Sequence, residues 1–196
     1  MKKLLLIGAI ALSGASMVNA QKIGAKAGVN IATIGGDVKD TKSKVGFHVG
    51  LYAEWAIAEK FSIQPEVLYS AQGAEGKEDG VDLKMNLDYI NIPVMFKYKA
   101  TDKLSIEAGP QVGFLINSKF KAESIEGDAS MDAKDAFKKI DFSIGLGAGY
   151  DITEKFNVGV RYMAGVSNIL ESKFWGTDDY KAHNNVFSLS VGYRFK

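Results

Sequence analysis

The stretch from Ser43 to Gly73 reads SKVGFHVGLYAEWAIAEKFSIQPEVLYSAQG, and it decides the fold. Its first half alternates strictly between apolar side chains on one face and glycine or polar side chains on the other. The two sets are Val45, Phe47, Val49, Leu51, Ala53 and Trp55, and Gly46, His48, Gly50, Tyr52 and Glu54. Because successive side chains of a strand point to opposite faces, this period of two predicts a β-strand. The alternation resumes after 56–60, so the stretch predicts a hairpin with strands of about ten residues or more, longer than is usual.

The apolar face of this hairpin carries aromatic rings at both ends. Phe47 and Trp55 lie eight residues apart on the first strand, and Phe61 and Tyr69 lie eight apart on the second. At ~3.3 Å per residue and a tilt near ~40°, the rings stand roughly 20 Å apart along a membrane normal. Two rows of aromatic rings around an aliphatic band of this height are typical of strands that cross an outer membrane.

Composition and the N-terminus indicate export rather than nucleic-acid binding. The 196 residues contain no cysteine and carry a formal net charge of +1, without a basic cluster that could hold RNA or DNA. Two lysines, a short apolar run and a small residue before Gln21 predict a signal peptide over residues 1–20 and one barrel domain over residues 21–196. No later segment approaches 18 continuous apolar residues, which excludes a helical membrane protein.

Six further segments alternate in the same way as the hairpin, which gives eight strands in all. They are Lys22–Ile31, Tyr89–Tyr98, Leu104–Phe114, Ile140–Asp151, Phe156–Val166 and Phe187–Phe195. Three short turns repeat in sequence, as Ala58-Glu59-Lys60-Phe61, Thr101-Asp102-Lys103-Leu104 and Thr153-Glu154-Lys155-Phe156. Between them we expect long polar connections, one of them with a helical part around Asp132 to Phe137. These connections are Thr33–Lys44, Gly73–Lys84, Asn117–Lys139 and Leu170–His183.

This regular alternation of hairpins predicts an all-β fold, an eight-stranded antiparallel up-and-down transmembrane β-barrel. A bilayer accepts strands only when the sheet closes and leaves no free edge. Both termini then lie at the short turns, which we expect in the periplasm, and the long loops are expected to be extracellular.

A soluble lipocalin-like barrel is the alternative, with the apolar face inside around a ligand. The sequence favours the membrane barrel, because aromatic rings at both ends of nearly every strand make girdles and a poor cavity lining. The polar face is rich in glycine and serine, and its charges balance. They are Lys26, Lys97, Arg161 and Arg194 against Glu54, Glu66, Glu107 and Asp141. The narrow lumen of an eight-stranded barrel has room only for such side chains.

Four segments also resemble the PorT-like outer-membrane β-barrel family, which is related in form to OmpX- and OmpA-type barrels. They are GVNIATI from Gly28, QPEVLYS from Gln64, YINIP from Tyr89 and GYRF from Gly192. The resemblance covers the whole mature chain and implies the barrel, but hardly an activity. Two positions depart from it: Asn91 stands where similar proteins commonly have an acidic residue, and Lys196 follows Phe195. A terminal aromatic residue is similar to the signal read by the barrel-assembly machinery, which the resemblance implies as a partner during biogenesis.

Candidate catalytic and metal-binding residues are few. His48 is expected on the lumen face, and His183 could be imagined with Asp178 or Asp179 and Ser172 as a catalytic group, but there is no nucleophile motif. Acidic loop residues could bind Ca²⁺ or bridge to lipopolysaccharide, but no 12-residue calcium loop is present. They are Asp37, Asp40, Glu78, Asp79, Asp82, Asp178 and Asp179. We therefore expect no enzyme, no catalytic or metal site and no cofactor.

The lumen charges lead to the sharpest expectation. Glu66 and Arg161 each lie five residues past the first aromatic residue after a short turn, Phe61 and Phe156, which places them at one height. We expect Arg161 to pair with Glu66, Glu107 or both and to plug the barrel. The leading function is a monomeric structural or surface-interaction protein in outer-membrane lipid, with a ligand at its extracellular loops. A narrow transporter or an accessory part of a secretion system is the alternative, and a lipid-modifying enzyme is a weaker one.

Overall fold

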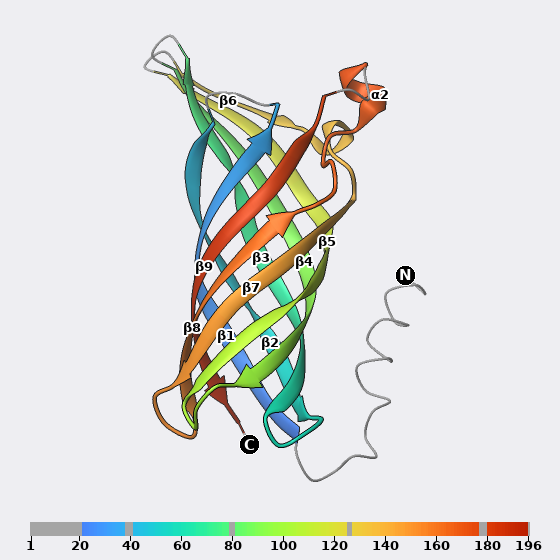
Figure 1. Ribbon diagram of the computed structural model, residues 1–196. Coiled ribbons are helices and arrows are strands. Elements are labelled where there is room, and N and C mark those ends of the chain that lie inside the picture. The colour runs from blue at the N-terminus through green and yellow to red at the C-terminus, as the bar shows by residue number, and fades with distance from the viewer. Residues whose placement is uncertain (1–20, 38–40, 79–80, 125–126, 177–179, 196) are drawn as a thin grey trace, which may run out of the picture.

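The computed structural model describes residues 21–37, 41–78, 81–124, 127–176 and 180–195, and the predicted signal peptide lies outside them. Eight long strands follow one another along the chain. They are β1 (Gln21–Gly36), β2 (Lys42–Ala56), β3 (Phe61–Glu78), β4 (Val81–Lys99), β5 (Leu104–Ser124), β7 (Ile140–Asp151), β8 (Phe156–Gly165) and β9 (Ala182–Arg194). Each pairs antiparallel with the next one, and β1 pairs with β9, so the sheet closes into a barrel (Figure 1). The predicted eight-stranded barrel is confirmed.

Three small elements lie outside this ring. A ninth strand, β6 (Gly127–Asp132), pairs with the far end of β5, from Lys119 to Ser124. A 3-10 turn, η1 (Lys134–Ala136), and one helical turn, α2 (Ser172–Trp175), complete the same end of the barrel, opposite the short turns (Figure 1). Among the described residues, no helix is long and apolar enough to span a membrane.

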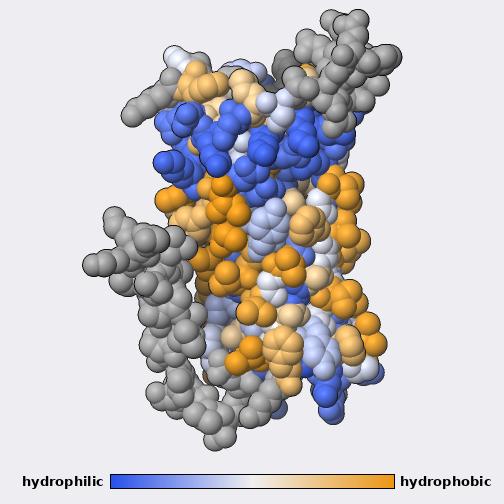
Figure 2. All heavy atoms as spheres, turned by 180° about the vertical axis from the view of Figure 1, so that it is seen from behind, coloured by the Kyte–Doolittle hydropathy of each residue, from blue (hydrophilic) through white to orange (hydrophobic). Residues whose placement is uncertain are grey.

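The two faces of the strands are those that the alternation predicts. Leu51 and Leu146 are 57% and 64% exposed on the outside, whereas Glu66 is 2% exposed in the lumen. Ring pairs flank the apolar band: Phe47 with Tyr69 at 5.5 Å near one rim, and Phe61 with Tyr98 at 5.1 Å near the other. Figure 2 shows this hydrophobic band around the barrel and a hydrophilic belt above it, at the end that carries β6 and α2. An apolar exterior and a polar interior exclude the lipocalin-like alternative.

Two of the segments predicted to be polar loops are largely strand in the structure. Most of Gly73–Lys84 is strand, since β3 continues to Glu78 and β4 begins at Val81. The predicted loop Asn117–Lys139 contains the end of β5, all of β6 and η1, which is the helical part expected near residue 134. The period of two persists there, but charged side chains now occupy the outer face because it meets water above the membrane rather than lipid. Because of this polarity, the sequence pattern was interpreted as loops rather than as strands.

The ends of β3 and β5 and the start of β4, together with β6, therefore form a sheet that extends past the rest of the barrel, here called the projecting sheet (Figure 1). Its rungs are regular: Glu75 pairs with Lys84, Lys84 with Lys121, and Lys121 with Ser130. In the part of the chain that the structure describes, β6 pairs with β5 alone, so its other edge offers unpaired backbone groups.

Candidate functional site: the filled lumen

The centre of the lumen holds a layer of paired charges. Arg161 on β8 donates from both terminal nitrogens to Glu66 on β3, at 2.7 and 3.0 Å, and from Nε to Glu107 on β5 at 2.7 Å. Lys26 on β1 donates to the same Glu66 carboxylate at 2.7 Å. The expectation that Arg161 pairs with Glu66, Glu107 or both is confirmed, and it pairs with both. Since these side chains are buried, the layer is stable only while every charge keeps its partner.

A second charged layer lies nearer the short turns. Lys97 donates to Glu54 and to Gln64, each at 2.9 Å, and so joins this layer to the central one through Gln64 and Glu66. Arg194 pairs with Asp151 at 2.6 Å, a carboxylate outside the set of charges that the sequence predicts to balance in the lumen. Asp141 lies toward the other end and accepts a hydrogen bond from Ser167 at 2.5 Å.

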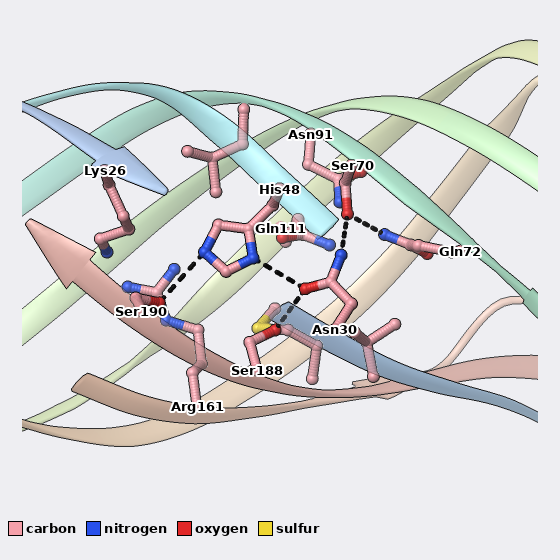
Figure 3. Close-up of a pocket in the computed structure, with 13 residues that line it drawn as sticks. Lys26, Asn30, His48, Ser70, Gln72, Asn91, Gln111, Arg161, Ser188 and Ser190 are labelled. Atoms are coloured by element: carbon pink, nitrogen blue, oxygen red, sulfur yellow. Dashed lines mark hydrogen bonds between the residues drawn. The ribbon is translucent and has the colours of Figure 1, made fainter. Parts of the chain in front are cut away.

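Above the central layer, hydrogen-bonded polar groups line a small cavity together with Lys26 and Arg161 (Figure 3). His48 lies between Asn30 Oδ1, 2.8 Å from its Nδ1, and Ser190 Oγ, 3.1 Å from its Nε2. Asn30 donates from Nδ2 to Ser70 at 2.9 Å and accepts from Ser188 at 2.9 Å. Gly28 makes room for the imidazole, because a Cβ there would lie 2.6 Å from the ring. The network fixes the ring and fills the lumen with paired polar groups.

The order of these three groups is that of a serine–histidine–asparagine general-base system. Asn30 Oδ1 is an acceptor, so Nδ1 of His48 carries the proton and Nε2 can accept the Ser190 hydroxyl proton. The cavity measures about 30 Å³, room for roughly two water molecules and for no acyl substrate. The geometry therefore supports an ordered polar plug rather than nucleophilic catalysis.

An apolar cluster, here called the cap, closes the mouth opposite the short turns. Its members are buried: Ile34, Ala74, Leu87, Tyr89, Ala133, Ala136, Phe137, Ile169, Leu170 and Ala182. Phe137 and Leu170 come from connecting segments and pair through an isolated β-bridge, and Phe120 packs on Phe137 with ring centres 5.9 Å apart. The sequence analysis did not identify the cap; the apolar pairs 136–137 and 169–170 inside polar connections were the available signal.

Among the residues that the structure describes, the other candidates do not come together as a site. His183 Nδ1 lies 2.8 Å from the backbone oxygen of Ser167, while Ser172 begins α2, and Asp178 and Asp179 lie outside the described residues. Of the acidic loop residues, Asp37 accepts one hydrogen bond from the backbone N–H of Lys181. Asp40 and Asp79 are outside the described residues, as are the side chains of Glu78 and Asp82. No group of three metal-ligating side chains is present among the described residues.

A closed barrel with an apolar exterior, aromatic girdles and a filled polar lumen defines a small outer-membrane β-barrel protein. The chain belongs to the family described as outer membrane protein beta-barrel domain, whose match covers residues 19–171. This family also sets its location in the outer membrane. A comparison with curated proteins finds no significant match.

Solved structures agree with this fold. The chain is similar to Ail, the attachment invasion locus protein of Yersinia pestis, with a TM-score of 0.55 at 14% identity over 90% of this chain and 100% of that one. It is also similar to Ail in complex with the heparin analogue sucrose octasulfate, with a TM-score of 0.53 at 16% identity and the same coverage. Neisserial surface protein A gives 0.54 at 13% identity, again over 90% and 100%. At these identities the likeness concerns the fold.

Proposed function

We propose that this protein acts at the cell surface through its projecting sheet and the connections beside it, and that the barrel serves as its membrane anchor. The observation that carries the proposal is the contrast between the two parts. The lumen is filled at every level by the two charged layers, the hydrogen-bonded polar groups and the cap. The projecting sheet extends beyond the apolar band and leaves one edge of β6 unpaired among the described residues. Such an edge can take up an extended segment of a partner.

The similar structures support this proposal without extending it. One of them is an attachment protein by name, and one holds a heparin analogue. The described surface of this chain gives no reason to transfer that ligand, because the projecting sheet carries both lysines and carboxylates, for example Glu75 opposite Lys84 and Lys119 opposite Asp132. The PorT-like relationship and a part in secretion stay predictions. The absence of catalysis is likewise our proposal, based on the size of the cavity at His48.

The experiment replaces residues 121–130 by a two-residue Asn-Gly turn, which removes β6 and its pairing segment while leaving the cap and the ring of strands. Cells that display the wild-type barrel are expected to attach to a protein-coated surface more strongly than cells that display the shortened barrel. Equal surface amounts, measured with an antibody to a tag at another loop, are the control. Equal attachment by both forms would refute a binding role for the projecting sheet.

A narrow channel or transporter is the competing function, and the unbroken layers in the lumen argue against it. The alternative predicts single-channel conductance from the wild-type protein in a planar bilayer. If the barrel serves only as a membrane anchor, no single-channel conductance is expected.

A further inference from the structure

The three short turns, at 57–60, 100–103 and 152–155, lie together at the other end of the barrel, and this end is here called the short-turn mouth (Figure 1). Each turn presents a lysine in an equivalent position. The backbone oxygens of Lys60, Lys103 and Lys155 accept hydrogen bonds from the backbone N–H groups of Lys99, Asp151 and Arg194, all at 2.8 Å. These hydrogen bonds form the last rung of the barrel, so the repeated turn sequence sets lysines at one height around the mouth.

The charges at this mouth are left unpaired, unlike those deeper in the lumen. Each of the four cations deeper in the lumen forms an ion pair with a carboxylate. They are Lys26, Lys97, Arg161 and Arg194. Five lysines at the mouth form no ion pair in the described chain: Lys22, Lys60, Lys99, Lys103 and Lys155. Only three carboxylates at the turns face them, those of Glu59, Asp102 and Glu154, and all three are exposed to solvent. The mouth therefore carries an excess of positive charge.

Arg194 adds a buried donor without an acceptor. Its two terminal nitrogens bind Asp151 at 2.6 Å and the backbone oxygen of Glu154 at 3.2 Å, while its Nε is buried and has no partner among the described residues. Arg194 is 6% exposed and borders a cavity of about 10 Å³, the size of one water oxygen. Lys99 and Lys103 line the same cavity, together with the carboxylates of Glu54, Asp102 and Asp151. Glu54 and Asp151 are already held by Lys97 and Arg194.

We propose that the short-turn mouth binds an oxyanion of the phosphate type. The anion would lie beside the cavity that the Arg194 guanidinium borders, and the ammonium groups of Lys99 and Lys103 would contact its outer oxygens. A tetrahedral anion with several oxygens suits separate donors of this kind, and hydrogen bonds between charged groups are the stronger ones. The phosphate is either free or part of a phospholipid headgroup at the edge of the apolar band.

The test measures thermal unfolding of the purified full-length protein by its mobility shift on gels, in phosphate or chloride at one ionic strength. We expect a saturable rise of the unfolding midpoint with phosphate. The Lys99→Gln/Lys103→Gln double variant should bind roughly tenfold more weakly, as expected for the loss of two charge-assisted contacts. Both lysines are exposed, so the variant should fold. A Lys134→Gln/Lys139→Gln variant, with two exposed lysines removed at the opposite end, is the matched control and should respond like the wild type.

A second arm replaces phosphate by vesicles of phosphatidylcholine with or without phosphatidylglycerol. Stabilisation by phosphate in detergent indicates a free ligand, and stabilisation by phosphatidylglycerol alone indicates a headgroup. Either result supports the site only if the Lys99/Lys103 variant loses it and the control variant keeps it. Equal effects of phosphate and chloride without a preference for phosphatidylglycerol, or equal losses in both variants, would overturn the proposal. Attachment through the projecting sheet is measured separately and does not depend on this result.

Discussion

At the scale of single residues, Arg161 connects three strands across the lumen. Its guanidinium reaches Glu66 on β3 and Glu107 on β5, and Lys26 shares the Glu66 carboxylate. Arginine suits this place because its planar group offers several fixed donors and keeps its charge. The arrangement stabilises the barrel only as a set, because any carboxylate left alone in the lumen would be a buried unpaired charge.

We therefore expect Arg161→Ala to lower the free energy of unfolding by about 3–5 kcal/mol, and by less if water enters the lumen. Arg161→Lys, which keeps the charge but loses the forked contact, should show a smaller loss. Urea unfolding in lipid vesicles, followed by tryptophan fluorescence, measures both. An unchanged stability of Arg161→Ala would mean that the charged layer is already wet and contributes nothing to the plug.

At the scale of elements, the strands at the β6 end extend well past the membrane band. The segment expected to be one long loop, Asn117–Lys139, is paired backbone from Asn117 to Ser124, and β6 pairs back onto it. Proteases need unpaired backbone, so the accessible sites should be fewer than a loop of that length would offer. Lys134 in η1 is exposed and is the best trypsin site in this segment, whereas the backbone oxygen of Lys139 already accepts a hydrogen bond from Leu115.

Trypsin added to intact cells is expected to cut at Lys134 first, and to leave the short turn at 100–103 intact. The physical reason is that the short turns should face the periplasm if both termini do. Mass spectrometry of the fragments identifies the sites, and permeabilised cells provide the control in which Lys103 also becomes accessible. Cleavage at Lys103 in intact cells would show that the barrel is inverted.

At the scale of the whole molecule, two separate barriers block the lumen of the barrel. The charged layers occupy the centre and the short-turn half, and the cap covers the other mouth. The charged layers lie on the barrel strands, whereas half of the cap, including Phe137, Ile169 and Leu170, comes from connecting segments. Opening one barrier should therefore leave the other in place.

We expect no single-channel conductance from the wild-type protein, from Arg161→Ala or from Phe137→Ala. Only the double variant should conduct, because it removes the central cation and about one ring volume from the cap. Planar-bilayer recordings measure this, and heat-modifiable gel mobility confirms that each variant is folded. Conductance in Arg161→Ala alone would show that the cap does not seal the mouth.

The sequence by itself determined the barrel and the centre of its lumen. One face of each strand contacts lipid and the other contacts packed polar groups, and this difference produces the period of two in the sequence. The short turns set the height of each residue in the strand that follows. Glu66 and Arg161 lie the same number of residues after Phe61 and Phe156, and this equal spacing was therefore enough to predict their ion pair.

Only the tertiary structure decided the rest. Above the membrane both faces of a strand can be polar, so the alternation no longer distinguishes the projecting sheet from a loop. Arg194 pairs with Asp151 because the stagger of the strands, which no local pattern records, sets which carboxylate lies within reach. The cap joins Phe137 to Leu170 from connections far apart in the chain, and their burial exists only once the barrel has brought the strand ends together.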